Sequence, residues 1–126
     1  YFWNTTALPL VKEVDFVSIH IYPFWHRKPH EEALDNTTLA YEATKENIKD
    51  KPIIITEAGW PTQSNLGTYT TTEFQNKYVE GLENWAKKND VLVYYFEAFD
   101  EPWKGSDKPD EPEKHWGLYD LNRNKK

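Results

Sequence analysis

The stretch that decides the fold is residues 53–61, which reads IIITEAGWP. Its first four residues are β-branched, and such a continuous run suits a parallel strand that is covered on both faces. Glu57 follows at the carboxyl end of this strand, where parallel α/β sheets gather their functional groups. In the next turn, Gly59 permits a close backbone approach or a positive φ, Pro61 stiffens the exit, and Trp60 offers an apolar face beside the carboxylate. The stretch therefore predicts a functional carboxylate at the edge of a parallel sheet.

Two further stretches repeat this arrangement. Apolar runs begin at residues 15, 53 and 91, and one strand, one helix and two loops would fill each interval. We expect parallel strands near residues 15–22, 53–57 and 91–97, with Tyr22, Glu57 and Glu101 converging at their carboxyl ends. The polar and aromatic residues at these strand ends are His20, Tyr22 and Trp25, then Glu57 and Trp60, and finally Glu101, Trp103 and Lys104.

The segments between the strands have helical patterns. Residues 70–73 read TTTE, the form of a capping box, and apolar residues follow at steps of three and four up to a favourably charged end at Lys87. Residues 34–49 carry a looser apolar face. Residues 8–14 suit a short helix that enters the first strand, whereas the charged, proline-containing residues 105–114 predict an exposed loop.

The length of the chain sets a further expectation. The 126 residues amount to one domain, yet three strands that are buried on both faces cannot cover one another without more sheet. The sequence starts at Tyr1 without Met and has no apolar run long enough for a membrane span or a signal peptide. We therefore expect residues 1–126 to be a portion of a larger domain.

The amino-acid composition limits the classes of ligand and partner that the chain is expected to bind. The absence of Cys excludes disulfides and a thiol nucleophile, and a net charge of −6 with scattered basic residues argues against nucleic acid and anionic membranes as partners. Aromatic residues make up 16% of the chain, which favours a neutral, hydroxyl-rich ligand stacked on rings. His26 and His30 are four residues apart, but Pro29 interrupts a helix and no carboxylate completes a ligand set, so the sequence predicts no metal and no cofactor.

Four motifs in order carry a resemblance: HIYP at 20–23, ITEAGWP at 55–61, FEAFDEPWK at 96–104 and HWGL at 115–118. Together they resemble glycoside hydrolase family 17, the endo-β-1,3-glucanases and related glucanosyltransferases. The resemblance spans nearly the whole chain and implies an α/β fold, namely the last three βα units of a (β/α)8 TIM barrel with parallel strands. It also implies that residues 1–126 are the carboxyl-terminal portion of a single catalytic domain, in a secreted or cell-envelope enzyme.

The resemblance also implies roles for individual residues. Glu57 is expected to be the nucleophile of a retaining reaction on β-1,3-glucan, with Glu101 and Lys104 beside the catalytic centre. Tyr22 is expected to line the site. Sugar-stacking or hydrogen-bonding positions are further expected at the neighbouring aromatic and imidazole side chains, Trp25, Trp60, Trp103 and His20.

The sequence departs from the family in one respect. A retaining reaction needs a second carboxyl group as acid/base, and the family takes it from an Asn-Glu motif on the fourth strand, which is not among these residues. Glu97 or Glu101 could be assigned the role of acid/base. Lys104, however, would more naturally keep Glu101 ionised than raise its pKa into the range of an acid. The acid/base is therefore expected outside this chain.

Purely structural roles for some of these residues, and other functions for the chain, stay open. His20 and Tyr22 alternate with isoleucines, so one of them could simply pack, and Glu97 could face either the interior or the site. The leading hypothesis is a retaining β-1,3-glucanase or transglucosidase, since both share a covalent intermediate. The alternatives are a non-catalytic glucan-binding part-barrel and a part-barrel that completes itself by self-association through its strand edges.

Overall fold

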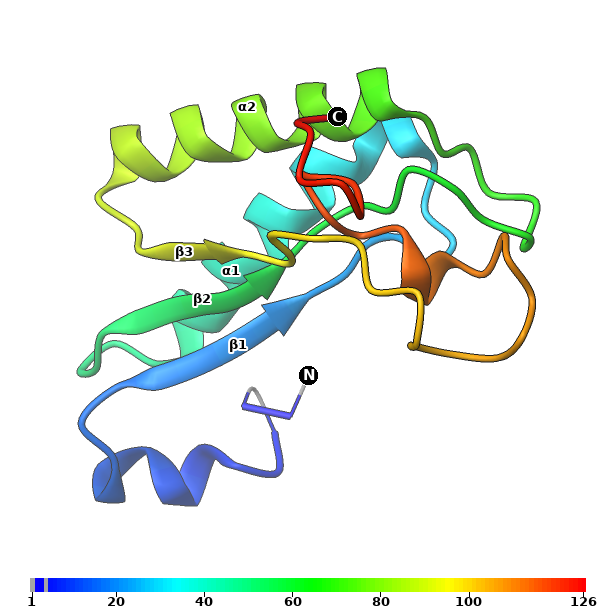
Figure 1. Cartoon of the computed structure of the whole chain (residues 1–126). Coiled ribbons are helices and arrows are strands. Elements are labelled where there is room, and N and C mark those ends of the chain that lie inside the picture. Colours follow the sequence, from blue (N-terminus) through cyan, green and yellow to red (C-terminus); the bar gives the residue numbers. More distant parts are fainter. Residues whose placement is uncertain (1, 4) are drawn as a thin grey trace.

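The computed structural model describes residues 2–3 and 5–126 and has a parallel three-stranded sheet at its centre, in the order β1-β2-β3 (Figure 1). The bounds of its strands are β1 Val17–Ile21, β2 Ile53–Ala58 and β3 Val93–Tyr95. The three predicted strands are therefore confirmed. The third is shorter than expected because its regular pairing with β2 ends at Tyr95, although Phe96 still donates its N–H to Ala58.

Two long helices follow the first two strands, α1 (Ala33–Asn47) and α2 (Thr72–Asn89). The side chain that caps α2 belongs to Thr71, which accepts the N–H of Phe74, so the prediction that the capping box begins at residue 70 was wrong by one residue. Helix α2 ends at Asp90 in the left-handed conformation.

Three short 3₁₀ helices complete the fold: η1 Leu8–Glu13, η2 His30–Glu32 and η3 Pro112–Lys114. The first confirms the short helix expected before β1. The exposed loop expected at residues 105–114 is confirmed for residues 105–109, whereas the segment ends in a helical turn whose Pro112 is buried. Among the described residues, no helix is long and apolar enough to cross a membrane.

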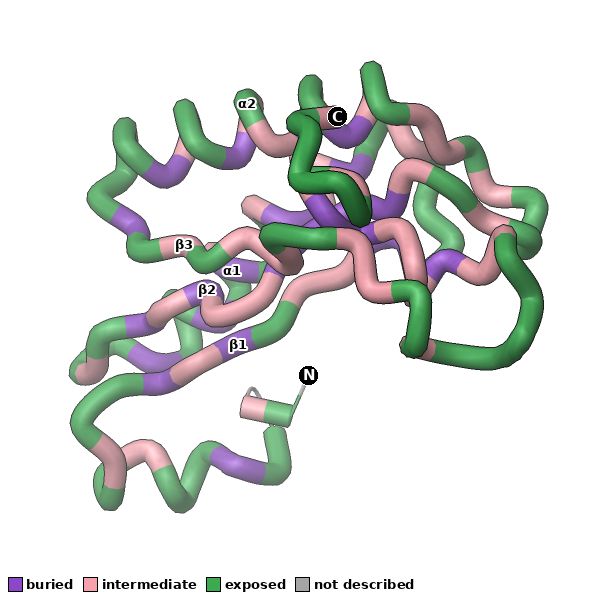
Figure 2. Tube along the Cα trace, in the orientation of Figure 1, coloured by how far each residue is buried: buried purple, intermediate pink, exposed green. Residues whose placement is uncertain are grey.

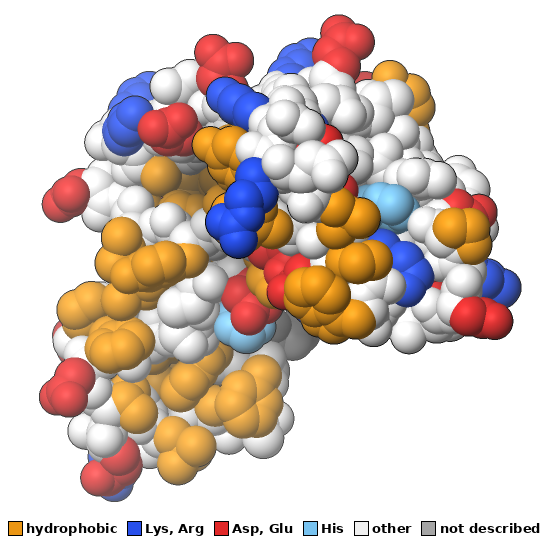
Figure 3. All heavy atoms as spheres, in the orientation of Figure 1, with side chains coloured by type: hydrophobic (Ala, Val, Ile, Leu, Met, Phe, Trp, Pro, Cys, Tyr) orange, Lys and Arg blue, Asp and Glu red, His pale blue; other side chains and the backbone are white. Residues whose placement is uncertain are grey.

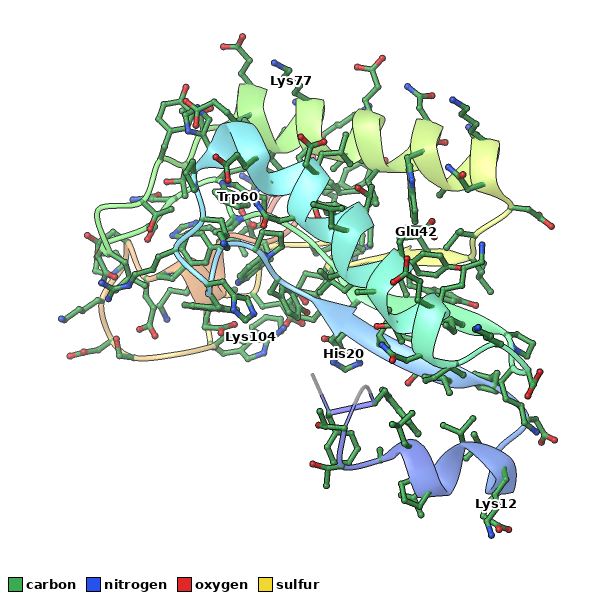
Figure 4. The ribbon with its side chains drawn as sticks, turned by 180° about the vertical axis from the view of Figure 1, so that it is seen from behind. Lys12, His20, Glu42, Trp60, Lys77 and Lys104 are labelled. Atoms are coloured by element: carbon green, nitrogen blue, oxygen red, sulfur yellow. The ribbon has the colours of Figure 1, made fainter. Side chains whose placement is uncertain are left out.

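The core lies between the sheet and the two helices, which cover the same face (Figures 1 and 4). Burial alternates along the strands: Val17 and Ile19 are buried in β1, whereas Ser18 is half-buried and His20 is exposed (Figure 2). Within the described chain, the strands are therefore not buried on both faces. The physical reason is that no helix or second sheet in the described chain covers the other face, so only one face of each strand enters the core.

The core continues into the loops that follow the strands. Trp60 and Trp116 are its largest fully buried side chains, and both contact the ring of Phe24. The side-chain amide of Gln75, on α2, donates hydrogen bonds to the carbonyl groups of Trp60 and Trp116, at 2.9 and 3.1 Å. Helix α2 thereby fixes two loops at the carboxyl ends of the strands.

Gly59 is required by a close backbone approach. A Cβ atom at this position would lie 2.0 Å from the carbonyl oxygen of Phe96, which is backbone and cannot rotate away. We predict that Gly59→Ala lowers the free energy of unfolding by about 3 kcal/mol, as expected for overpacking, measured by chemical denaturation.

Gly81→Ala is the matched control. Its Cβ would meet the flexible end of Leu34 at 2.8 Å, and the substitution adds helix propensity within α2. We expect its unfolding free energy to stay within about 1 kcal/mol of the parent protein. Equal losses in both variants would contradict the role given to the close approach at Gly59.

Candidate active site

Glu57 lies in β2, opposite His20 of β1. The pairing of β1 with β2 shifts register between Ile19 and His20, and this irregularity sets His20 beside Glu57. The hydroxyl of Tyr22 donates a hydrogen bond of 2.6 Å to Oε2 of Glu57, and Nδ1 of His20 lies 3.2 Å from the same oxygen. The ends of two adjacent strands thus hold one carboxylate in a fixed orientation.

Lys104 joins two further carboxyl groups after β3. Its Nζ lies 2.8 Å from Oε2 of Glu97 and also contacts Oε2 of Glu101. The hydrogen bond from Lys104 holds the pKa of Glu101 below its usual range, which favours its ionised form. Burial is the main cause that raises the pKa of Glu97. The two neighbouring carboxyl groups therefore have opposite protonation preferences.

Aromatic rings connect the two groups of carboxylates. The ring of Tyr22 packs edge-to-face on Phe96 and Trp116, with centroids 5.7 and 5.2 Å apart. The ammonium of Lys104 lies 4.5 Å from the centroid of Phe96. Burial and the hydrogen bond to Glu57 raise the pKa of Tyr22, so its hydroxyl remains a donor. Contacts therefore run without a break from Glu57 to Glu101.

The structure brings most predicted site residues together at one end of the sheet. Tyr22, Glu57 and Glu101 converge as expected, and His20 contacts Glu57. In Figure 3, acidic and histidine side chains meet near the middle of one face, flanked by hydrophobic and basic side chains. A cavity of about 740 Å³ opens between the amino-terminal segment, β1 and α1; His20 and Tyr22 are in its lining, whereas Glu57, Glu101 and Lys104 are not.

The three tryptophans that were predicted to contact a ligand differ in their burial. Trp60 is fully buried and donates its indole N–H to the carbonyl of Tyr69, so the prediction that it offers its face to a ligand was wrong (Figure 4). The residue instead fills the core, where its ring packs against Phe24 and against Phe74 and Tyr78 of α2. Trp25 and Trp103 are 42% and 73% exposed and remain available to a ligand.

The structure also places Phe96, Glu97 and Trp116 here, and the sequence had assigned none of them a definite role in the site. Glu97 had been weighed as an alternative acid/base and left undecided between the interior and the site, and its ion pair with Lys104 places it beside Glu101. Trp116 belongs to a motif that had carried the resemblance, and that motif was the available signal. His30, in contrast, stacks on Tyr69, and no cluster of three potential metal ligands occurs in residues 2–3 and 5–126.

The sequence of this chain matches a known protein family. A sequence profile described as the BtgE/BtgC glycoside hydrolase domain matches residues 1–117. The chain belongs to this family.

Similar proteins agree with the assignment. A glucan 1,3-β-glucosidase of Arthroderma benhamiae is 30% identical over 98% of the chain, which spans 46% of that protein. A putative glucan endo-1,3-β-glucosidase, btgC, of Aspergillus niger is 31% identical, and the chain spans 20% of it. The crystal structure of a family 17 β-1,3-glucanosyltransferase from Rhizomucor miehei has a TM-score of 0.83 and 31% identity, with 93% of this chain and 43% of that chain covered. The resemblance to family 17 is confirmed, and the chain spans less than half of each of these relatives.

The contacts of Lys104 with Glu97 and Glu101 predict how the unfolding free energy depends on pH. A depressed carboxyl pKa contributes stability that is present above the pKa of the unfolded chain and is lost as the pH falls through the folded value. We predict that Lys104→Met raises the pKa of Glu101 and flattens the acid-side dependence of unfolding free energy on pH, measured by carboxyl NMR titration and denaturation.

Lys87→Met serves as the control, because Lys87 pairs with the exposed Glu83 on α2 and lowers the pKa of that residue alone. It should leave the titration of Glu101 unchanged. A Glu101 that titrates at the same pH with and without Lys104 would rule out the assigned cause.

Proposed function

We propose that this chain is the carboxyl-terminal portion of the catalytic domain of a retaining glycoside hydrolase that acts on β-1,3-glucan, with Glu57 as nucleophile. The observation that carries the proposal is the arrangement around Glu57. Tyr22 and His20 both contact Oε2, which orients the carboxylate and leaves Oε1 to face a sugar. Membership in the glycoside hydrolase family supplies the reaction class.

The proposed reaction has two displacements. Oε1 of Glu57 attacks the anomeric carbon, the glycosidic C–O bond breaks, and the leaving oxygen takes a proton from a general acid. The conjugate base of that acid then removes a proton from water, whose oxygen attacks the same carbon and releases Glu57. The hydroxyl of Tyr22 orients Glu57 without supplying a full positive charge, which would weaken the nucleophile.

The general acid/base is proposed to lie outside these 126 residues. A retaining pair of carboxyl groups is separated by about 5 to 5.5 Å, and each partner needs its own protonation state. Lys104 holds the pKa of Glu101 below its usual range, which does not suit Glu101 to proton donation. The three strands and two helices are proposed to be the last βα units of a (β/α)8 barrel, whose other strands carry the acid.

Trp25 and Trp103 are proposed to bind the glucan. Both indoles are exposed, and Trp25 also packs against Trp116, which touches Tyr22. An exposed ring beside hydrogen-bonding carboxylates stacks on the apolar face of a sugar while the carboxylates bind its hydroxyl groups.

A second candidate is glucan transfer, in which a sugar hydroxyl replaces water in the second displacement. It is favoured by the similarity to the glucanosyltransferase of Rhizomucor miehei, of which an active-site mutant is also known in complex with laminaritriose. Product analysis with laminari-oligosaccharides distinguishes the two, because transfer yields chains longer than the substrate.

In the full-length protein, Glu57→Gln should lower kcat on laminarin by at least about a thousandfold while glucan binding persists. Glutamine keeps the shape of the side chain but cannot form the covalent intermediate. Steady-state kinetics and a binding assay measure the two effects. Glu83→Gln, an exposed substitution on α2, is the control and should retain activity. Near-normal hydrolysis by Glu57→Gln would exclude Glu57 as the nucleophile.

The isolated 126-residue chain should be inactive and should self-associate. Inactivity follows from the absent acid/base, and self-association follows from the exposed edges of β1 and β3 and from apolar side chains such as Leu92 and Tyr94, which are 51% and 57% exposed. Laminarin hydrolysis and analytical ultracentrifugation test both parts. A stable monomer that hydrolyses the glucan would place the acid within these residues.

A further inference from the structure

Three ionisable groups meet after β3, and the number of positive groups does not match the number of acidic groups. One ammonium, Lys104, serves the two carboxyl groups of Glu97 and Glu101, and the side chains of all three are 15–29% exposed. Two carboxylates at one partly desolvated site disfavour joint ionisation, because each adds repulsion to the other. One of the two groups therefore takes up a proton more readily than an isolated glutamate does.

The geometry indicates which group this is. Glu97 has the most buried side chain of the three, and its Oε1 has no hydrogen-bond partner among the described residues. Glu101 is paired with Lys104 through its Oε2 and has a more exposed side chain than Glu97. Negative charge on Glu97 would leave Oε1 buried without a hydrogen bond, whereas negative charge on Glu101 is paired with Lys104 on a more exposed side chain.

We propose that Glu97 is a positioning residue of the glycosidase site: in its neutral form it holds the Lys104 ammonium over the ring of Phe96 and leaves Glu101 as the ionised partner. This inference rests on the proposed function. Oε2 of Glu97 accepts a hydrogen bond from Lys104, and Oε1 has no hydrogen-bond partner among the described residues. Phe96 in turn contacts Tyr22, which orients Glu57.

The surroundings of Glu97 support this role. Besides Lys104 and Glu101, the ionisable groups near this part of the site include Tyr22 after β1, Glu57 in β2, and Glu113 and Lys114 in η3; the Nζ of Lys114 donates to the backbone carbonyl group of Lys104. Lys104 is the one lysine or arginine paired with Glu97 or Glu101 in the described chain. A second negative charge at Glu97 would draw Lys104 away from Glu101 and increase the repulsion around Glu57.

The protonation state gives a readout that is independent of activity. Burial raises the pKa of Glu97, so between the unfolded and folded pKa values the folded protein binds more protons. Unfolding free energy then falls as the pH rises through that interval. Glu97→Gln, which cannot ionise, removes this fall, whereas Glu83→Gln, at an exposed carboxylate, leaves it unchanged.

Kinetics of the full-length protein on laminari-oligosaccharides give the second readout. Glu97→Ala should lower kcat about a hundredfold, as expected for a misplaced charged group, and Glu97→Gln should recover most of that loss because its amide oxygen still accepts from Lys104. In the background Lys104→Ala, Glu97→Ala should have little further effect, because the two residues act as a unit.

The outcomes separate this inference from the proposed function. A Glu97→Gln variant as impaired as Glu97→Ala, or one with an unchanged pH dependence of unfolding, would overturn the neutral positioning role. Additive losses in the double variant would show a merely structural effect and would also overturn it. If the parent protein has no activity on β-1,3-glucan, the proposed function fails, and the unfolding experiment still tests the state of Glu97.

Discussion

One buried amide ties together the parts of the structure that carry the site. Gln75 is completely buried on α2, and its Nε2 donates to the carbonyl groups of both Trp60 and Trp116. Without this donor, the carbonyl group of Trp60 would lose its partner, at a cost of about 1–3 kcal/mol, and that of Trp116 would keep only the N–H of Glu97 at 3.3 Å. The ring of Trp116 supports Tyr22, so the orientation of Glu57 depends on a contact made in the helical layer.

Two close backbone approaches then bring the strand ends together. Gly59 lies against the carbonyl of Phe96, and a Cβ at Gly117 would lie 2.1 Å from the backbone nitrogen of Asp100. Asp100 accepts the N–H of Gly117 and pairs with Lys126 at 2.8 Å. These contacts fix the backbone on either side of Glu97 and Glu101, and therefore limit where their charges can lie.

The sequence predicted the three strands, both long helices and the convergence of Tyr22, Glu57 and Glu101, because apolar runs and polar strand ends are local patterns. It did not predict the burial of Trp60, because the direction of a turn depends on what packs behind it. Glu97 was undecided for a similar reason: it follows the last regular residue of β3, where alternation no longer assigns a face. The alternating burial of the strands was also missed, because it depends on which layers are present.

The arrangement of charge explains how several carboxyl groups can share one site and differ in chemistry. Glu57 is oriented by the neutral hydroxyl of Tyr22, which burial keeps protonated, and by the exposed His20. Lys104, the strongest cation nearby, pairs with Glu97 and Glu101, and no ion pair joins it to Glu57 in the described chain. A lysine bound directly to Glu57 would stabilise its charge and reduce its nucleophilicity. The separation of Lys104 from Glu57 is therefore as important to the proposed chemistry as the contacts that Glu57 makes.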